Sequence, residues 1–476
     1  MVKRQDTPRQ SNPQAQKKPN RKSRRTPKIT ANTPVGICED RLTAFGGLMA
    51  LVKMFDLLDF EREFNKYYGA PKRLPQLGHY RMVSGILMLL FIGFQRLGHF
   101  AYLRGEVMLC GLLRVPLLPV VTTFWRYLRS LGIGQSASLL NLSGVLRAKV
   151  WEQVKYAPKK VGVNIDTTTA TVYGNIEGSR KGYNPKHRGK KGLRPVLCFL
   201  QETREYLCGT QRRGTTLSSN EVARQIGQFR RLLPCCVQTV LVRGDGEMIG
   251  WESVEACEKE GFSFIFGNKR SEPPFAKKGW YRHGEHEYNE CVHQPMGWQQ
   301  PVRFVAMRIL NEKAQEKQLN LPEMDGYVYR IFATNCSGVP HRVVTEYDLR
   351  ADVENLIGEA QREGLLAIPS RSFQSHHAFF QIVMLAYNLW RWMKLMAGHC
   401  EEEKQPGKKP LEKKQITMPD HTLRIARLKM LFVAARIQHH GHRDVVRYSI
   451  HDDRTAGLLG FLKYLDRKRL EGRRAA

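Results

Sequence analysis

The sequence predicts an α/β protein in which an α/β core lies between two helical regions. Two short runs rich in β-branched residues, 161–165 and 237–242, have the length and composition of buried strands. Amphipathic helical patterns cover 221–233 and 347–361. Residues 42–150 carry helical periodicity instead. The middle of the chain is therefore expected to alternate strands and helices around one sheet.

The composition predicts a polyanionic partner. The 476 residues include 76 Lys and Arg against 44 Asp and Glu, a formal charge of +32. Such an excess of positive charge predicts nucleic acid as the first candidate for this partner and an anionic membrane surface as the second. The most apolar window, 82–94, has 13 residues and is too short to cross a bilayer. The ten cysteines lack any C-x-x-C pair, and the chain begins without a signal-peptide core. We expect reduced thiols in a cytoplasmic protein.

The N-terminal third divides into a tail and a helical domain. Residues 1–35 hold ten Lys and Arg, one acid and five prolines, which predicts a disordered basic arm that either lies on DNA or only solubilises the chain. Residues 36–150 predict helices at 48–60, 80–94 and 102–113, and a last helix after Pro119. This arrangement is compatible with a helix-turn-helix whose Arg126 and Arg129 face DNA. A plain helical support domain is the alternative.

Residues 151–266 form the first part of the predicted core. The first strand runs into Asp166, further strands are expected at 167–173, 195–200 and 206–208, and a later strand runs into Asp245. Between them lies a basic segment with no acid, 14 residues after Asp166. It is expected to form a hairpin that grips phosphates, with a solvated loop as the alternative. Its basic residues are Arg180, Lys181, Lys186, His187, Arg188, Lys190, Lys191 and Arg194.

Three further regions follow. Residues 267–335 predict a β-rich insertion, with strands at 302–310 and 327–334 and with Trp280 and Trp298 among Gly, Pro and basic residues. Residues 336–400 complete the core and include an apolar helix at 378–396; residues 401–476 predict a linker and a C-terminal helical region. A set in the insertion has the residue types for zinc, but its spacing fits no regular finger. That set is His283, His286, Cys291 and His293.

The helix at 347–361 carries two stripes. Its apolar stripe, anchored in the core, consists of Val353, Leu356, Ile357 and Ala360. A second stripe, about 90° round the helix, consists of Tyr347, Arg350, Glu354 and Gln361. Glu354 therefore faces a cleft, whereas Asp352 projects away; Asp348 and Asp352 remain rival acids. Together with Asp166 and Asp245, Glu354 supplies the hard oxygen ligands that Mg²⁺ and Mn²⁺ prefer.

These residues resemble the DDE transposases of bacterial insertion sequences, in the subgroup with a Tyr-x2-Arg-x3-Glu helix and a β-strand insertion before the last acid. The resemblance covers about 155–400, with separations of 245 − 166 = 79 and 354 − 245 = 109 residues between the acids. The subgroup has a Lys seven residues after the Glu, where this chain has Gln361. An RNase H-like core with a mixed sheet is implied by this resemblance.

The resemblance also implies a reaction. Asp166, Asp245 and Glu354 would hold two Mg²⁺ or Mn²⁺ ions for DNA cleavage at the element ends and for strand transfer to target DNA. Arg350 would grip a phosphate, Tyr347 would contact the strand end, and Trp298, or second Trp280, would stack on a flipped base. The implied partner is double-stranded DNA, bound by a homodimer in a bacterial cytoplasm. A nuclease without strand transfer and a catalytically inactive sequence-specific DNA-binding protein are the rival functions.

Overall fold

The computed structural model describes residues 28–182, 184, 187–269, 273–310, 323–324, 326–403 and 418–475. The chain divides into two compact units, Met1–Asp40 and Arg41–Ala476. Most of the predicted basic arm, residues 1–27, lies outside the described residues. The elements described below all belong to the second unit.

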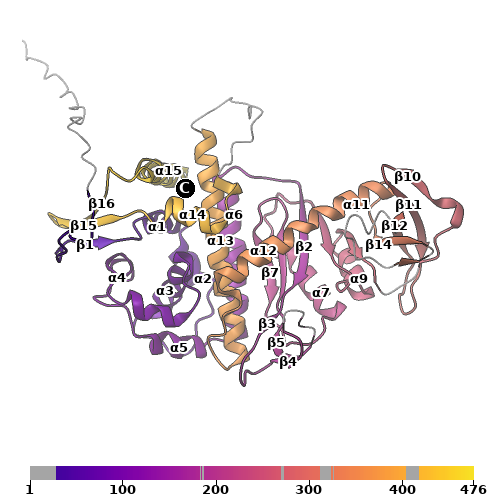
Figure 1. Ribbon diagram of the computed structural model, residues 1–476, viewed down its shortest axis with the longest axis horizontal. Coiled ribbons are helices and arrows are strands. Elements are labelled where there is room, and N and C mark those ends of the chain that lie inside the picture. Colours follow the sequence, from indigo (N-terminus) through magenta and orange to yellow (C-terminus); the bar gives the residue numbers. More distant parts are fainter. Residues whose placement is uncertain are drawn as a thin grey trace, which may run out of the picture. The chain divides into compact units, whose positions relative to one another are not determined.

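A mixed sheet forms the core (Figure 1). Its central strand β2 pairs in parallel with β8, and β8 pairs in parallel with β9. On the other side β6 is antiparallel to both β2 and β7. The mixed α/β fold predicted for the core is thereby confirmed. The strands are β2 (Lys160–Thr167), β6 (Val196–Leu200), β7 (Tyr206–Thr210), β8 (Thr239–Gly244) and β9 (Ser263–Gly267).

The strands between residues 281 and 334 extend this same sheet. β14 pairs antiparallel with β9, and three further strands continue outward from β14 in the order β12, β11, β10. The open edge of β9 is thereby covered, and the described strands of the insertion belong to the core sheet. The strands are β10 (Tyr281–His283), β11 (His286–His293), β12 (Val302–Leu310) and β14 (Tyr327–Thr334), with the short β13 (Glu323–Met324) beside β14.

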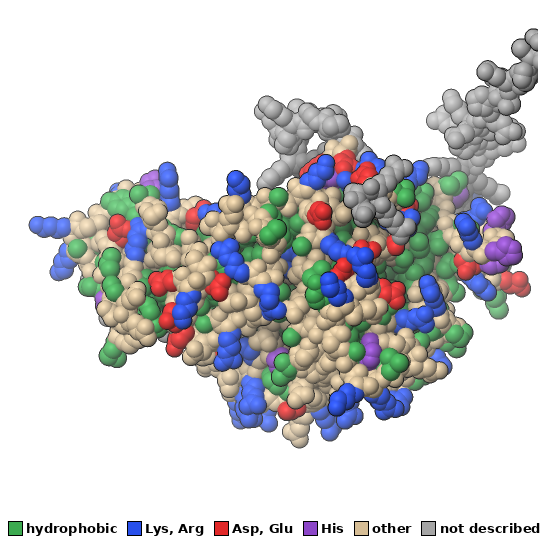
Figure 2. All heavy atoms as spheres, turned by 180° about the vertical axis from the view of Figure 1, so that it is seen from behind, with side chains coloured by type: hydrophobic (Ala, Val, Ile, Leu, Met, Phe, Trp, Pro, Cys, Tyr) green, Lys and Arg blue, Asp and Glu red, His purple; other side chains and the backbone are tan. Residues whose placement is uncertain are grey.

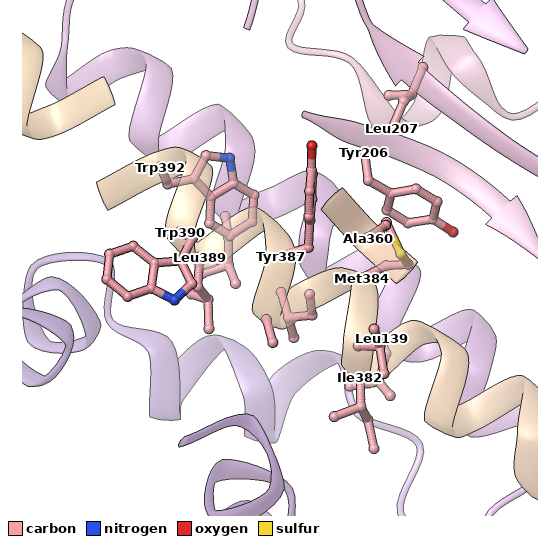
Figure 3. Packing of buried hydrophobic residues seen from close by; sticks show 14 of the residues in the cluster. Leu139, Tyr206, Leu207, Ala360, Ile382, Met384, Tyr387, Leu389, Trp390 and Trp392 are labelled. Carbon is pink, nitrogen blue, oxygen red and sulfur yellow. The ribbon is translucent and has the colours of Figure 1, made fainter. Parts of the chain in front are cut away.

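Three long helices make the core beside the sheet: α3 (Gly78–Ile92), α6 (Ile133–Gln153) and α13 (Phe373–Glu403). α13 packs against both α6 and α3. Figure 3 shows Tyr387, Trp390 and Trp392 of α13 among the buried side chains. In the part of the chain that the structure describes, no single helix is long and apolar enough to cross a membrane. α3 passes that test only together with η1 (Leu97–Leu103), across a bend of 84°.

A buried carboxylate ties these helices to the sheet. Glu205, in the turn between β6 and β7, is fully buried. It accepts hydrogen bonds from Arg147 Nε of α6 at 2.8 Å, Trp151 Nε1 at 2.7 Å and Trp392 Nε1 of α13 at 2.7 Å. Arg147 also donates to the carbonyl oxygens of Tyr206 and Leu232. All of these donors are desolvated, so each depends on its acceptor.

Replacing Glu205 with Gln is expected to lower the free energy of unfolding by about 3 kcal/mol, because it leaves the charge of Arg147 buried without its counterion. The neutral amide also turns an N–H₂ group toward donors that need an acceptor. Urea denaturation would measure the loss. The control is Glu255→Gln, which removes a partly exposed i,i+4 pair with Lys259 and should cost less than about 1 kcal/mol. Equal losses for the two variants would contradict the importance of the buried network.

Several predicted elements divide differently. The helix expected at 48–60 is two helices, because Asp59 takes a left-handed conformation with φ 52°. The helix expected at 102–113 is η1 followed by a separate α4, and the one expected at 221–233 breaks before Phe229. The strand expected at 167–173 is only β3 (Ala170–Thr171). The resulting helices are α1 (Leu48–Leu57), α2 (Phe60–Tyr67), α4 (Val107–Leu113), α7 (Ser219–Ile226) and α8 (Phe229–Leu232).

The C-terminal region is also less helical than predicted. A hairpin of β15 (Ala435–His440) and β16 (Arg443–Tyr448) joins β1 (Arg41–Thr43) in a small antiparallel sheet. Its turn contains Gly441 at φ 60°, a conformation that glycine adopts without strain. The hairpin separates α14 (Leu423–Met430) from α15 (Arg454–Ala475).

Candidate active site

Two carboxylates lie at the ends of neighbouring parallel strands. In the register of β2 with β8, Ile165 lies opposite Gly244. Asp166 and Asp245 are therefore the next residues on adjacent strands, at the carboxyl edge of the sheet. Asp245 accepts the backbone N–H of Glu247 at 3.0 Å, which fixes the turn after β8. Open α/β sheets commonly bind their ligands at this edge.

The carboxylate of Asp166 is held at both oxygens. Its Oδ2 accepts a hydrogen bond from Arg350 Nη2 at 2.8 Å, and its Oδ1 accepts the backbone N–H of Thr167 at 2.7 Å. Burial raises the pKa of Asp166 to about 6; Arg350 opposes this rise, whereas the charges of Asp245 and Glu354 add to it. The pKa of Asp166 is thus perturbed by both of the other acids that the sequence singled out.

A nearly continuous helical run crosses this edge. It comprises α11 (Pro340–Asp348), the 3₁₀ turn η3 (Leu349–Ala351), α12 (Asp352–Ala360) and the π turn η4 (Gln361–Leu365). The helix predicted at 347–361 is therefore interrupted by a tighter turn, and that turn carries Arg350. The predicted apolar stripe is confirmed, because Val353, Leu356, Ile357 and Ala360 are all buried.

The acids of this run differ in their partners. Asp348 accepts from Arg330 at 2.5 Å, Asp352 accepts from Arg204 at 2.7 Å, and the buried Glu359 binds Arg391. Glu354 is exposed, and among the described residues its side chain forms no hydrogen bond or ion pair. Its charge nevertheless acts on Asp166 and on Arg350. Of Asp348, Asp352 and Glu354, only Glu354 has a carboxylate without a hydrogen-bond or ion-pair partner among the described residues.

Tyr347 and Gln361 attach the helical run to the strand ends. The ring of Tyr347 lies 4.5 Å from that of Phe332, and burial raises the pKa of its hydroxyl. A Cβ at Gly267, the last residue of β9, would lie 3.3 Å from that hydroxyl. Gln361 Nε2 donates to Thr168 Oγ1 at 2.7 Å, two residues after Asp166. Gln361 therefore ties the end of α12 to the strand that carries Asp166, a contact that the sequence pattern did not indicate.

The basic segment forms a small sheet beyond Asp166. β5 (Lys191–Leu193) lies between β3 and β4 (Arg180–Lys181). Its cationic side chains are exposed, and those that the structure describes form no ion pair or hydrogen bond; they are Arg180, Lys181, Arg188, Lys190 and Lys191. Lys186 lies outside the described residues. Arg194 differs from them, because it is nearly buried and paired with Glu247 at 2.5 Å.

The predicted DNA-contacting helix is α5 (Val121–Arg129). Phe124 and Leu128 are buried, while Arg126 and Arg129 are exposed. α5 packs against η1, α3 and α13. Figure 2 shows Lys and Arg side chains gathered along the lower edge of the molecule, where Figure 1 places α5, β4 and β5. The exposed cations of two regions distant in sequence thus face the same side.

The two insertion tryptophans have packing partners. Trp298 is half-buried, with Trp251 of α9 (Trp251–Lys259) and Phe304 of β12 at centroid distances of 6.0 and 6.2 Å. The guanidinium of Arg308 lies 4.0 Å from the ring centre of Trp280.

His283, a member of the set with the residue types for zinc, stacks on His341 with a distance of 4.0 Å between the ring centres. Within the described residues, no three His, Cys, Asp or Glu side chains are grouped closely enough to hold a metal ion.

Comparison with known proteins gives three findings. No curated protein matches the chain. Among solved structures, a piggyBac transposase synaptic complex with hairpin DNA is similar over 80% of each chain, with 9% sequence identity and a TM-score of 0.42, which is too distant to assign a function. The family described as Transposase DDE domain group 1 matches residues 38–468, which is most of the chain. The chain therefore belongs to this family of DDE transposases, which are nucleic-acid-cleaving enzymes.

Proposed function

We propose that this transposase cuts DNA at the ends of its insertion sequence and transfers those ends to target DNA. Asp166, Asp245 and Glu354 are the proposed catalytic residues. The observation that carries this assignment is that the carboxylate of Glu354 has no hydrogen-bond or ion-pair partner among the described residues. The neighbouring Asp348 and Asp352 each pair with an arginine. Its charge and that of Asp245 both raise the pKa of Asp166. Such perturbed carboxylates at a strand edge are typical of functional sites.

The three acids fit divalent cations by the chemistry of their carboxylates, although the structure does not group them closely enough to form a metal site as they stand. Carboxylate oxygens are the ligands that Mg²⁺ and Mn²⁺ prefer. The charge of Asp166 is disfavoured by burial and by two neighbouring acids, and Arg350 is its ion-pair partner. We propose that Asp166, Asp245 and Glu354 would together hold two such ions. When bound, such ions neutralise phosphate charge and activate the attacking oxygen.

The surrounding side chains bind and orient the substrate. The backbone N–H of Thr167 holds Asp166 Oδ1, and Gln361 holds the segment that follows. Arg350 lies beside Asp166 with a second nitrogen, Nε, that is buried without a partner. We propose that this guanidinium binds the phosphate next to the cleaved bond. Tyr347 would pack against the strand end.

The exposed cations define the proposed duplex contacts. Arg126 and Arg129 on α5 and the basic segment from Arg180 to Lys191 would neutralise phosphates along the DNA. Trp298 is retained as a base-stacking candidate in the insertion, although its present contacts are with the core. We propose that two copies of the chain act on a pair of DNA ends in a bacterial cytoplasm.

The test is cleavage of a labelled duplex that carries the ends of the element encoding this chain, in the presence of Mg²⁺. Glu354→Gln is expected to bind this duplex normally and to cut it at least about 100-fold more slowly, because it loses one charged ligand. The matched control is Asp352→Asn, two residues earlier, which weakens a half-exposed pair with Arg204 and a contact with Asn355 and should cut normally.

The other outcomes select the rival functions. If wild type and both variants bind the duplex and none cuts with Mg²⁺ or Mn²⁺, the chain is a DNA-binding protein without catalysis. If wild type cuts the duplex but joins no end to target DNA, it is a nuclease without strand transfer. Equal cutting by wild type and Glu354→Gln would overturn the assignment of Glu354.

A further inference from the structure

An open groove of about 670 Å³ lies outside the carboxylate site. Its walls come from η1, α5, the segment that follows β3, and the loop after η4. Two of these neighbours follow, in sequence, the elements that carry proposed catalytic acids. β3 begins four residues after Asp166, and the loop at 366–369 follows the helical run that carries Glu354. The groove is therefore connected to the active site through both elements.

Exposed aromatic side chains are concentrated in this groove. Among the described Phe, Trp and Tyr residues, four are exposed by more than a third, and three of them line it. Tyr102 is 83% exposed, Tyr173 70% and Trp125 44%, and each comes from a different element. A single amphipathic face cannot explain this gathering. Large exposed rings that gather in a concave site are typical of ligand contact.

The charge of the groove favours an anion. None of its lining residues is Asp or Glu. Arg96 lines the groove and is exposed, and its side chain forms no hydrogen bond or ion pair with the described residues. Arg126 adjoins Trp125 on α5, and Thr171 on the opposite wall pairs with Gly192, next to Lys191. His99 also lines the groove.

We infer that this groove binds an unpaired nucleotide of the DNA substrate, with its base against Trp125, Tyr102 and Tyr173 and its phosphate toward Arg96. The volume lies in the range of about 300 to 1,000 Å³ that holds ligands of nucleotide size. In an intact duplex the base faces are stacked on each other, so only an unpaired base can present its face to these rings. The inference rests on DNA being the substrate, as proposed above.

The test compares binding of two fluorescein-labelled probes to the full chain without divalent ions: an oligothymidylate of ten nucleotides and a ten-base-pair duplex. Trp125→Ala combined with Tyr173→Ala is expected to weaken oligothymidylate binding by between about fivefold and about 150-fold per base lost from the stack. Duplex binding should change less than about threefold. Trp125→Phe should retain most of the affinity, because its ring still stacks.

The control is Tyr281→Ala, which removes the fourth exposed aromatic ring, on β10 outside the groove. It should leave binding of both probes unchanged. The inference is overturned if wild type fails to bind oligothymidylate, if the double variant binds it as wild type does, or if both probes weaken equally. Thermal unfolding of each variant verifies that these exposed substitutions leave the fold intact.

The groove and the catalytic assignment can fail separately. If wild type cuts DNA with Mg²⁺ and the double variant binds oligothymidylate as wild type does, the nucleotide-binding role of the groove is disproved. The proposed transposase reaction then still stands. If the double variant loses oligothymidylate binding and wild type does not cut DNA with Mg²⁺ or Mn²⁺, the nucleotide-binding role of the groove is supported. The proposed transposase reaction is then disproved.

Discussion

Asp166→Asn is expected to reduce DNA cleavage by at least about a thousandfold while leaving duplex binding within about twofold. The charges of Asp245 and Glu354 both act on Asp166, because both of them raise its pKa. Asp166 is one of the three acids that would hold the ions, and loss of the charge stabilisation that bound ions supply costs several kcal/mol in the transition state. Single-turnover cleavage with Mg²⁺, beside duplex binding in EDTA, measures the two effects.

The matched control for this substitution is Asp348→Asn. Asp348 belongs to α11, is about half-exposed and pairs with Arg330, so its loss should change cleavage by less than about threefold. Cleavage by Asp166→Asn at the wild-type rate would mean that the strand-end acids only support the fold. Equal losses for the two variants would point to a general requirement for negative charge at this edge.

Lys394→Met is expected to raise the free energy of unfolding by about 4 kcal/mol near and below neutral pH. Lys394 of α13 is 1% exposed, and burial, followed by the charge of Arg391, lowers its pKa to about 7 from the ordinary 10.5. A difference of this size corresponds to about 5 kcal/mol. Methionine fills a similar volume but leaves the carbonyl oxygen of His421, which Lys394 now binds, without its donor, at about 1 kcal/mol.

The sign of this effect follows from proton binding. Between pH 7 and 10.5 the unfolded lysine is protonated and the folded lysine is mostly neutral, so the unfolded chain binds more protons and wild-type stability rises with pH. The gain from methionine is therefore full below pH 7 and disappears above about pH 10.5. Urea denaturation from pH 6 to 10 measures it, with the exposed Lys259→Met as control. A gain that is constant with pH would contradict this account.

The sequence by itself determined the features that local periodicity controls. Alternating β-branched residues placed Asp166 and Asp245 at strand ends, and the spacing of Val353, Leu356 and Ile357 fixed which face of the helix is buried. The same geometry directed Asp352 and Glu354 to different sides. These features were predictable because a side chain's direction along a strand or helix depends on its near neighbours alone.

Backbone conformation and side-chain partners were less predictable. The helix expected at 48–60 breaks because one residue, Asp59, is left-handed, and no local pattern marks that residue. Arg194 belongs to the basic segment in sequence, yet it folds inward to Glu247. Trp298, predicted to stack on a base, is half-buried against Trp251 and Phe304.

The tertiary structure alone decided which groups meet. It joined β14 to β9 and so merged the insertion with the core sheet. It gave Asp352 the distant Arg204 as partner, left Glu354 without a partner among the described residues, and brought Gln361 to Thr168. It also gathered Tyr102, Trp125 and Tyr173 around one groove. The physical reason is that these contacts join residues far apart in sequence, and only the packing of the whole chain sets their distances.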